Sequence, residues 1–253
     1  MTGPGPLSAV ALGGIPEVRA GDDLAEPLAA ALPADLADGD IVSVAHKVVS
    51  KAEGRTRRLE DVETSDLARQ LAAKYSKDAR VVQAVLDESV AVVRAGHGVL
   101  ICETHHGLVC ANAGVDRSNA ADAEELILLP VDPDASARAL RAGIAARRGV
   151  RPAIVISDSF GRAWRLGQTD VAIGAAGLTP LDDWRGRHDS RGRELHATAI
   201  AVADAITAAA DLARAKDADQ PAVLVRGLDR FVTADDGPGA MSLRRPPADD
   251  LFR

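Results

Sequence analysis

Apolar residues occur along the chain in short runs that are separated by polar or glycine-containing turns. Residues 41–49 (IVSVAHKVV) form such a run, rich in β-branched side chains, and the pattern predicts a buried strand. The same reasoning predicts strands at 91–94, 99–103, 108–111, 153–157 and 221–226.

Other segments have the apolar spacing of helices. Residues 134–148 carry a capping acid, apolar positions three to four apart and a basic last turn, and Gly149 follows as a stop. Helices are also predicted at 22–37, 65–74 and 80–89, and residues 195–215 begin like a strand and continue like a helix. Together these elements predict an α+β fold with mixed sheets and flanking helices, in one module of 253 residues that can hold two interleaved subdomains.

Composition narrows the class of protein. Apolar residues make up 47% and aromatic residues 2%, so the core must be built mainly from aliphatic side chains. A formal charge of −7 argues against nucleic-acid binding. No apolar run reaches the roughly 18 residues of a membrane span, and the first residues do not resemble a signal peptide. Two cysteines, Cys102 and Cys110, are too few for a disulfide framework, which fits the cytoplasm.

A first polar cluster follows the predicted strand 41–49. It contains His46, Lys47, Ser50 and Lys51, and Lys at the end of a core strand can face a phosphate group. The alternative is a strand end that is simply solvated. Spacing alone favours the solvated strand end, because Lys is usually exposed.

A second cluster lies around the adjacent His105 and His106. Neighbouring residues of a strand face opposite sides, so both histidines cannot easily bind one ion. Asp116, in the loop 114–119, is the better candidate for a divalent cation, which prefers carboxylate and hydroxyl oxygens. An Asx turn explains the same loop, and without further information it is the better interpretation.

A third cluster covers residues 157–170 and is dense in Asp, Ser, Arg, Gln and Thr. Asp158 follows an apolar strand, a common place to hold Mg²⁺ beside a nucleotide phosphate. Arg162 and Arg165 can bind a substrate carboxylate or phosphate, and Trp164 is interpreted as a packing residue. A loop held by its own ion pairs is the alternative, but the composition favours a functional site. The chain has no GxxxxGK[ST], GxGxxG, GxSxG or HExxH motif.

Longer ordered motifs extend over almost the whole chain, from about residue 13 to residue 253. They are GGIPEVRAGDDL, DGDIVSVAHKVVSKAEGR, GVLICETHHGLVCANAGVDRSN, LLPVDPDASARALR, ISDSFGRAWRLGQTDVAIGAAG, AVADAITAAADL, VLVRG and RRPPADDLFR. Together they resemble the family of coenzyme F420-0:L-glutamate ligases, or F420 gamma-glutamyl ligases. The N-terminal ligase module of an actinobacterial bifunctional F420 biosynthesis protein is similar to the same stretch.

The resemblance implies a GTP-dependent ligase of coenzyme F420 biosynthesis. It would join L-glutamate to coenzyme F420-0 through an acyl phosphate, and would then add further glutamate through γ-linkage. It also implies Mg²⁺ or Mn²⁺, with two ions bound, K⁺, and an intertwined homodimer.

Site residues follow from the same motifs. The nucleotide contacts implied are Ile15, Pro16, Glu17, Val18, His46, Lys51 and Asn119. Asp116 and Asp158 would bind a divalent metal and Ser159 a second ion, with Asp116, Asp158 and Lys51 as the catalytic residues. His46 stands where some relatives have a serine. The roles of Arg162 and Arg165 come from the residues alone and not from the family.

The bifunctional relatives continue into a nitroreductase-like domain, whereas this sequence stops at Arg253, so no such domain is expected. Two alternative functions remain. One is a non-catalytic module that binds GTP and metal and partners a reductase domain. The other is a ligase for another acidic acceptor.

Overall fold

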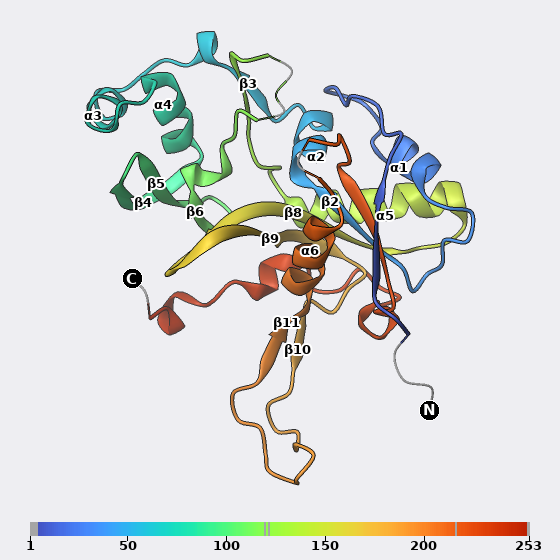
Figure 1. Ribbon diagram of the computed structural model, residues 1–253. Coiled ribbons are helices and arrows are strands. Elements are labelled where there is room, and N and C mark those ends of the chain that lie inside the picture. Colours follow the sequence, from blue (N-terminus) through green and yellow to red (C-terminus); the bar gives the residue numbers. More distant parts are fainter. Residues whose placement is uncertain (1–4, 119, 121, 216, 252–253) are drawn as a thin grey trace.

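A five-stranded mixed sheet forms the centre of the molecule (Figure 1). The computed structural model describes residues 5–118, 120, 122–215 and 217–251. Across the sheet the strands follow the order β1-β12-β2-β8-β9, and only β2 and β8 are parallel. Their bounds are Ser8–Leu12 (β1), Ile41–Ala45 (β2), Ala153–Arg162 (β8), Arg165–Ala176 (β9) and Ala222–Arg226 (β12).

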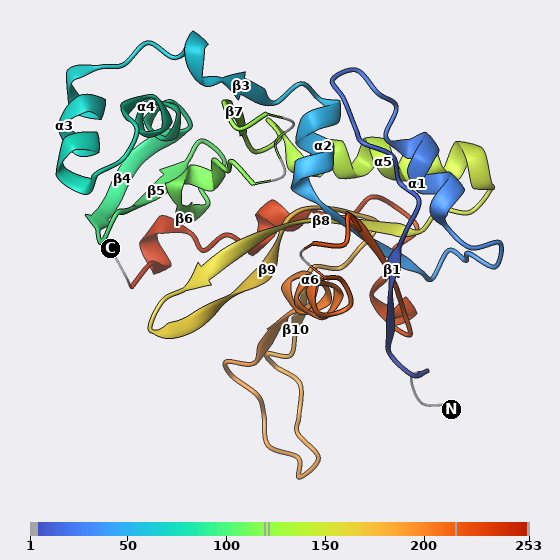
Figure 2. The same cartoon turned by 45° about the horizontal axis from the view of Figure 1, so that its top comes forward.

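Helices cover both faces of this sheet (Figure 2). They are α1 (Ala25–Ala31), α5 (Pro133–Arg148) and α6 (Val202–Leu212). Val42 and Ile154 point to the face of α1 and α5, whereas Ile41 and Val155 point to the face of α6. All four side chains are fully buried. Burial on both faces explains the uninterrupted apolar runs of these strands, and each such side chain contributes about 1.5–3 kcal/mol.

Helix α5 approaches the sheet closely at its first turn. A Cβ atom built on Gly174 of β9 would lie 2.3 Å from the carbonyl oxygen of Pro133, so only glycine fits at this position. Asp132 caps the helix by accepting the N–H of Ala135 at 2.9 Å. The helix predicted at 134–148 is confirmed, but its capping acid is Asp132 and not a residue of the predicted range.

A second group of elements lies beside the sheet (Figure 1). It contains α3 (Asp66–Tyr75), α4 (Ala79–Asp87) and a sheet of β4 (Ser89–Gly96), β5 (Val99–Thr104) and β6 (Val109–Ala111). Its own core includes Val82, Val85 and Leu100. The short pair β3 (Thr56–Arg58) and β7 (Glu125–Ile127) runs between this group and α2 (His46–Ala52).

An arm projects away from the body (Figure 1). Its base is the antiparallel pair β10 (Leu181–Asp183) and β11 (Ala199–Ala201), and residues 184–198 form its outer part. The 3₁₀ helices of the described residues are short; they are Leu59–Asp61, Asn112–Gly114, Asp229–Phe231, Ala240–Leu243 and Pro247–Asp249. None of the described helices is both long and apolar enough to cross a membrane.

The prediction of an α+β fold with mixed sheets and flanking helices is confirmed, with local corrections. The helix predicted at 22–37 is limited to α1, Ala25–Ala31. The strand predicted at 41–49 is wrong after Ala45, because α2 begins at His46. The alternative interpretation of residues 157–170 as a loop is wrong, since these residues belong mainly to the paired strands β8 and β9. Trp164 is not a packing residue: it lies in the turn of this hairpin and is 83% exposed.

Candidate functional site

The site lies where β2 ends and its pairing with β8 stops. The two strands are parallel and Ala45 is in register with Ser157, so the residues that follow them are brought to the same edge of the sheet. These residues are His46 and Asp158, and Nε2 of His46 lies 3.2 Å from Oδ1 of Asp158. A register shift between β8 and β9 occurs at Ile156/Ser157, directly before the site, and such bulges re-aim the side chains that follow.

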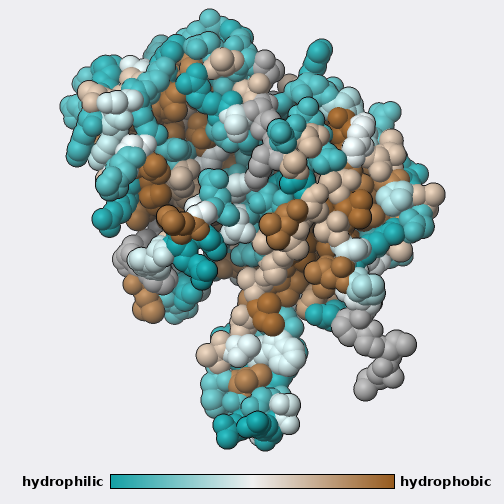
Figure 3. Space-filling view, in the orientation of Figure 1, coloured by the Kyte–Doolittle hydropathy of each residue, from teal (hydrophilic) through white to brown (hydrophobic). Residues whose placement is uncertain are grey.

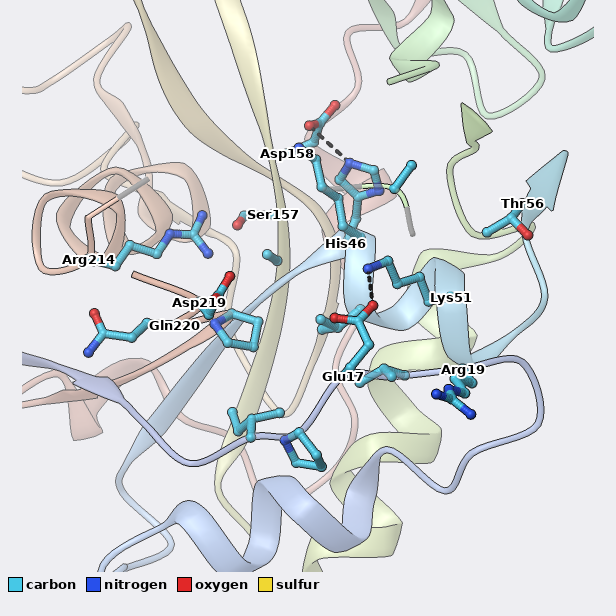
Figure 4. A pocket seen from close by; sticks show the side chains of 18 of the residues that line it. Glu17, Arg19, His46, Lys51, Thr56, Ser157, Asp158, Arg214, Asp219 and Gln220 are labelled. Atoms are coloured by element: carbon cyan, nitrogen blue, oxygen red, sulfur yellow. Dashed lines mark hydrogen bonds and ion pairs between the residues drawn. The ribbon is translucent and has the colours of Figure 1, made fainter. Parts of the chain in front are cut away.

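A cavity of about 850 Å³ opens at this edge (Figure 4). Its walls come from the loop after β1, the first turns of α2, the middle of β8 and the segment between α6 and β12. Many of the residues predicted for the site line it: Ile15, Pro16, Glu17, Val18, His46, Lys51, Asp158 and Ser159. The structure therefore brings together residues from three distant motifs around one space.

Lys51 crosses this cavity to the loop after β1 (Figure 4). Its Nζ donates to Oε1 of Glu17 at 2.6 Å. The Lys51 side chain is mostly buried, whereas the Glu17 side chain is 63% exposed. His46 and Ser50 are buried as well, so the interpretation of this cluster as a solvated strand end is wrong. Tertiary packing buries Lys51, although lysine side chains are usually exposed to solvent.

Asp170 forms a buried ionic centre at the side of the cavity. Its two carboxylate oxygens accept hydrogen bonds from the hydroxyls of Ser157 (2.8 Å) and Ser159 (2.6 Å), and Arg214 pairs with it. The side chain of Asp170 is 1% exposed and that of Arg214 is 11% exposed. Two hydroxyl donors and a guanidinium compensate the buried charge, which would otherwise be very costly.

Asp116 lies next to the cavity, and a cavity-lining lysine holds it. Lys47 Nζ lies 2.7 Å from Oδ2 of Asp116 and donates to the Ser118 hydroxyl at 2.5 Å. Both the backbone N–H and the hydroxyl of Ser118 donate to Asp116 at 2.8 Å. Burial acts to raise the pKa of Asp116, but the bonds from Lys47 and Ser118 outweigh it, and the pKa lies below its ordinary value. Asp116 is therefore ionised near neutral pH.

The remaining predicted residues lie elsewhere. Arg162 and Arg165 are at the far end of the β8–β9 hairpin and are not among the residues that line the cavity. Arg162 donates to the carbonyl oxygens of Leu166 and Gly167 in the hairpin turn. Asn119 lies outside the described residues.

Several cavity residues were not assigned a role from the sequence. They are Arg19, Thr56, Glu125, Asp170, Arg214, Asp219 and Gln220. Asp170 carried a recognisable signal, because an acid stood directly before the apolar run 171–176 in the third polar cluster. Arg214 carried none, since it follows an Ala-rich helix and only the packing of α6 against β9 brings it to Asp170.

The adjacent histidines and the cysteines are structural. His105 and His106 each place Nε2 on a backbone carbonyl oxygen, that of Asp87 at 2.9 Å and that of Pro130 at 2.8 Å. Cys102 and Cys110 are buried free thiols in register on β5 and β6. Burial raises the pKa of both thiols, and that of Cys110, also near Asp158, reaches about 12.

No group of three or more His, Cys, Asp or Glu side chains within the described residues is close enough to share a metal ion. Any ion held by Asp116 or Asp158 would therefore take further ligands from hydroxyls, water or a bound phosphate, as Mg²⁺ commonly does.

Comparisons with known proteins identify a family. The chain matches the family described as F420-0:Gamma-glutamyl ligase over residues 14–227. It is 45% identical to the coenzyme F420:L-glutamate ligase of Methanopyrus kandleri, over 94% of either chain. It is 42% identical to the protein of that name from Methanothermobacter thermautotrophicus, over 98% of this chain and 99% of the relative. It is 44% identical to the Haloarcula marismortui protein of the same name, over 98% of this chain and 96% of the relative.

Proposed function

Because the chain belongs to the F420-0:gamma-glutamyl ligase family, we propose that it attaches L-glutamate to coenzyme F420-0 in coenzyme F420 biosynthesis. Further glutamate is then added through γ-linkage. The names of relatives that match almost the full chain support this activity. The observation that carries it is that the motif residues Glu17, Lys51 and Asp158 line the same cavity.

The proposed chemistry begins with activation of a carboxylate, which does not react with an amine by itself. GTP transfers its γ-phosphoryl group to a carboxylate oxygen of coenzyme F420-0, which gives an acyl phosphate and releases GDP. The amine nitrogen of L-glutamate then attacks the carbonyl carbon, the C–O bond to phosphate breaks, and the nitrogen loses a proton. The products are an amide and inorganic phosphate.

Charges of the cavity residues suit this pair of substrates. A triphosphate and a carboxylate repel each other, so their reaction requires cations between them. Lys47, Lys51 and Arg19 supply positive charge along the cavity wall. Lys51 is mostly buried, and its ammonium is already directed to an oxyanion, the carboxylate of Glu17. A phosphate oxygen can take the place of that carboxylate, since Glu17 is exposed and free to turn outward.

Metal ions form part of the proposal, as Mg²⁺ or Mn²⁺ at two positions, together with K⁺. The donor chemistry fits: Asp158 supplies a carboxylate and Ser159 a hydroxyl beside the cavity, and Asp116 supplies an ionised carboxylate next to it. Bound there, the ions would neutralise phosphate charge as it is transferred. Lys47 would release Asp116 in this state and become available to the substrates.

We also infer a homodimer, as the family resemblance implies. The arm projects from the body (Figure 1). The strand pair at its base contains the partly exposed apolar residues Leu181 and Ile200. The face over α6 is largely apolar as well, whereas the outer part of the arm is mostly hydrophilic (Figure 3). Leu166, at the tip of the β8–β9 hairpin, is 95% exposed. Exposed apolar groups of this kind favour contact with a second chain, and light scattering after size-exclusion chromatography tests it.

GDP release tests the ligase activity. The reaction is run with GTP, Mg²⁺ or Mn²⁺, K⁺, coenzyme F420-0 and L-glutamate, and each component is left out in turn. We expect GDP and the glutamylated product to form together, and only in the complete mixture. Product formation from glutamate and another acid, without coenzyme F420-0, would indicate a different acceptor. GTP binding without any turnover would indicate a non-catalytic module.

Replacement of the two predicted metal ligands makes the test specific. Asp116→Asn and Asp158→Asn should each abolish turnover, because a neutral amide cannot compensate phosphate charge. Asp235→Asn is the control, since Asp235 is exposed and does not line the cavity. Near-normal turnover in one of the first two variants would remove that residue from the proposed site.

A further inference from the structure

His46 holds an unusual position among the polar groups of this chain. It is 1% exposed, and its Nε2 is the one buried side-chain nitrogen or oxygen atom without a hydrogen-bond partner in the part of the chain that the structure describes. A buried polar atom without a partner is unfavourable, so it calls for a group that satisfies it, such as a water molecule, an ion or a ligand. His46 lies in the cavity wall next to Asp158 (Figure 4).

The neighbour of this nitrogen is an oxyanion. Oδ1 of Asp158 lies 3.2 Å from Nε2, but the two atoms do not have the geometry of a hydrogen bond. Two ligand atoms that bind one ion at about 2.1 Å in an octahedral site are roughly 3 Å apart, and each points at the ion rather than at the other. The separation of the pair agrees with this arrangement, and Oδ1, which accepts the N–H of Ser159 at 2.7 Å, keeps a second lone pair for an ion.

The other ring nitrogen prepares His46 for such a role. Nδ1 lies 3.3 Å from the hydroxyl oxygen of Ser50, which is fully buried. When Nδ1 carries the proton and donates it to Ser50, Nε2 keeps a lone pair for a metal. Metal-binding histidines are commonly oriented in this way through their second nitrogen.

We propose that Nε2 of His46 and the carboxylate of Asp158 together bind one divalent transition-metal ion. The hydroxyl of Ser159 or a substrate oxygen completes the site. Imidazole nitrogen suits Mn²⁺ and the later metals of its row, whereas Mg²⁺ prefers oxygen ligands alone. A nitrogen ligand from His46 therefore shifts the metal preference of this site from Mg²⁺ towards Mn²⁺. The inference rests on the proposed metal dependence, but metal binding can be measured without turnover.

Manganese itself is the probe. Pulsed electron paramagnetic resonance of the full chain with one equivalent of MnCl₂ should show hyperfine coupling to a directly bound nitrogen. His46→Gln should lose this coupling and bind Mn²⁺ at least about tenfold more weakly, since loss of a ligand exceeds the effect of a lost supporting group. Mg²⁺ affinity should change by less than about threefold, because Mg²⁺ gains little from nitrogen.

Two further variants make the outcome decisive. His106→Gln is the matched control, since His106 is bonded to a backbone carbonyl and is not among the cavity residues, and it should keep both coupling and affinity. His46→Ser provides a second replacement if His46→Gln does not fold, because serine is small and its hydroxyl provides no nitrogen ligand. Unchanged Mn²⁺ affinity in both His46 variants, or bound Mn²⁺ without nitrogen coupling in the wild type, would overturn the proposal. Either result would leave the ligase proposal standing, because that proposal is tested by GDP release and not by metal binding. The two proposals can therefore fail separately.

Discussion

The hydroxyl of Ser159 donates a 2.6 Å hydrogen bond to Oδ1 of Asp170, its register partner across the β8–β9 pair. The same carboxylate accepts from Ser157 and pairs with Arg214. Asp170 thus fixes the hydroxyl that is proposed to meet a metal ion, and it also anchors the segment that closes one side of the cavity. The contribution of Asp170 to the fold can be measured as a change in the free energy of unfolding.

Asp170→Asn should lower the free energy of unfolding by about 3–5 kcal/mol, because it breaks a buried ion pair and leaves the mostly buried Arg214 only the more distant carboxylate of Asp211, at 3.7 Å. Urea denaturation followed by circular dichroism measures this change. The double variant Asp170→Asn/Arg214→Met should lose less than the single variant, since the mostly buried guanidinium is removed together with its main partner. A single variant as stable as the wild type would show that the ion pair does not support the fold.

Lys51→Met should weaken binding of a non-hydrolysable GTP analogue about 10- to 100-fold, since a charge-assisted hydrogen bond contributes about 1.5–3 kcal/mol. Glu17→Gln should change the affinity by less than about threefold, because it removes only an exposed partner of that lysine. Isothermal titration calorimetry in the presence of metal measures both. Lys74→Met, on the exposed surface of α3, is the control. Equal effects of the Lys51 and Lys74 variants would contradict the proposed role.

Asp204 should make the protein less stable as the pH rises above about 4. Burial raises its pKa, and the bond from the Ala172 N–H opposes this only in part. Below the ordinary Asp pKa of about 3.9 the group is protonated in both states. Above it, the unfolded chain releases the proton first, so folding becomes less favourable up to the raised pKa. Asp204→Asn should therefore gain stability over the wild type between pH 4 and pH 7, as urea midpoints will show.

The effect of pH on stability through Asp116 should be opposite to that through Asp204, so Asp116 serves as the comparison. Its pKa is lowered in the folded protein, so it contributes stability above about pH 4 and loses that contribution as the pH falls through the lowered value. The advantage of the wild type over Asp116→Asn should shrink on acidification. Parallel pH profiles for the two variants would contradict both assignments.

Arg165→Gln tests the predicted contact with an anionic substrate. If the contact exists, KM for coenzyme F420-0 or glutamate should rise at least about tenfold, as for loss of a charge-assisted bond, while GTP binding is unchanged. Arg165 suits this test better than Arg162, whose guanidinium is already bonded within the hairpin turn. Unaltered KM values for both substrates would remove Arg165 from the site.

Cys102 and Cys110 should resist thiol reagents in the native state. Only the thiolate reacts, and a pKa of about 12 leaves roughly one Cys110 in ten thousand ionised at pH 8. Ellman's reagent should therefore modify neither thiol in buffer within minutes and both in 6 M guanidinium chloride. Rapid modification of the native protein would show that β5 and β6 open readily.

Local patterns were sufficient for much of the fold. The helices at Asp66–Tyr75 and Pro133–Arg148 were predicted because their caps and apolar spacing act within a few residues. The ordered motifs likewise indicated the family, which the match over residues 14–227 confirms. Strand β9 was not predicted, because its polar first half resembles a loop until it pairs with β8.

The amino-acid sequence thus established the family, the fold class and several residues that line the cavity, all of which depend on short-range spacing or on matching motifs. Only the tertiary structure placed Nε2 of His46 beside Asp158 and brought Arg214 to Asp170. The physical reason is that these contacts depend on strand order and register. Parallel pairing of β2 with β8 and packing of α6 against β9 involve segments far apart in the chain, and no local preference specifies them.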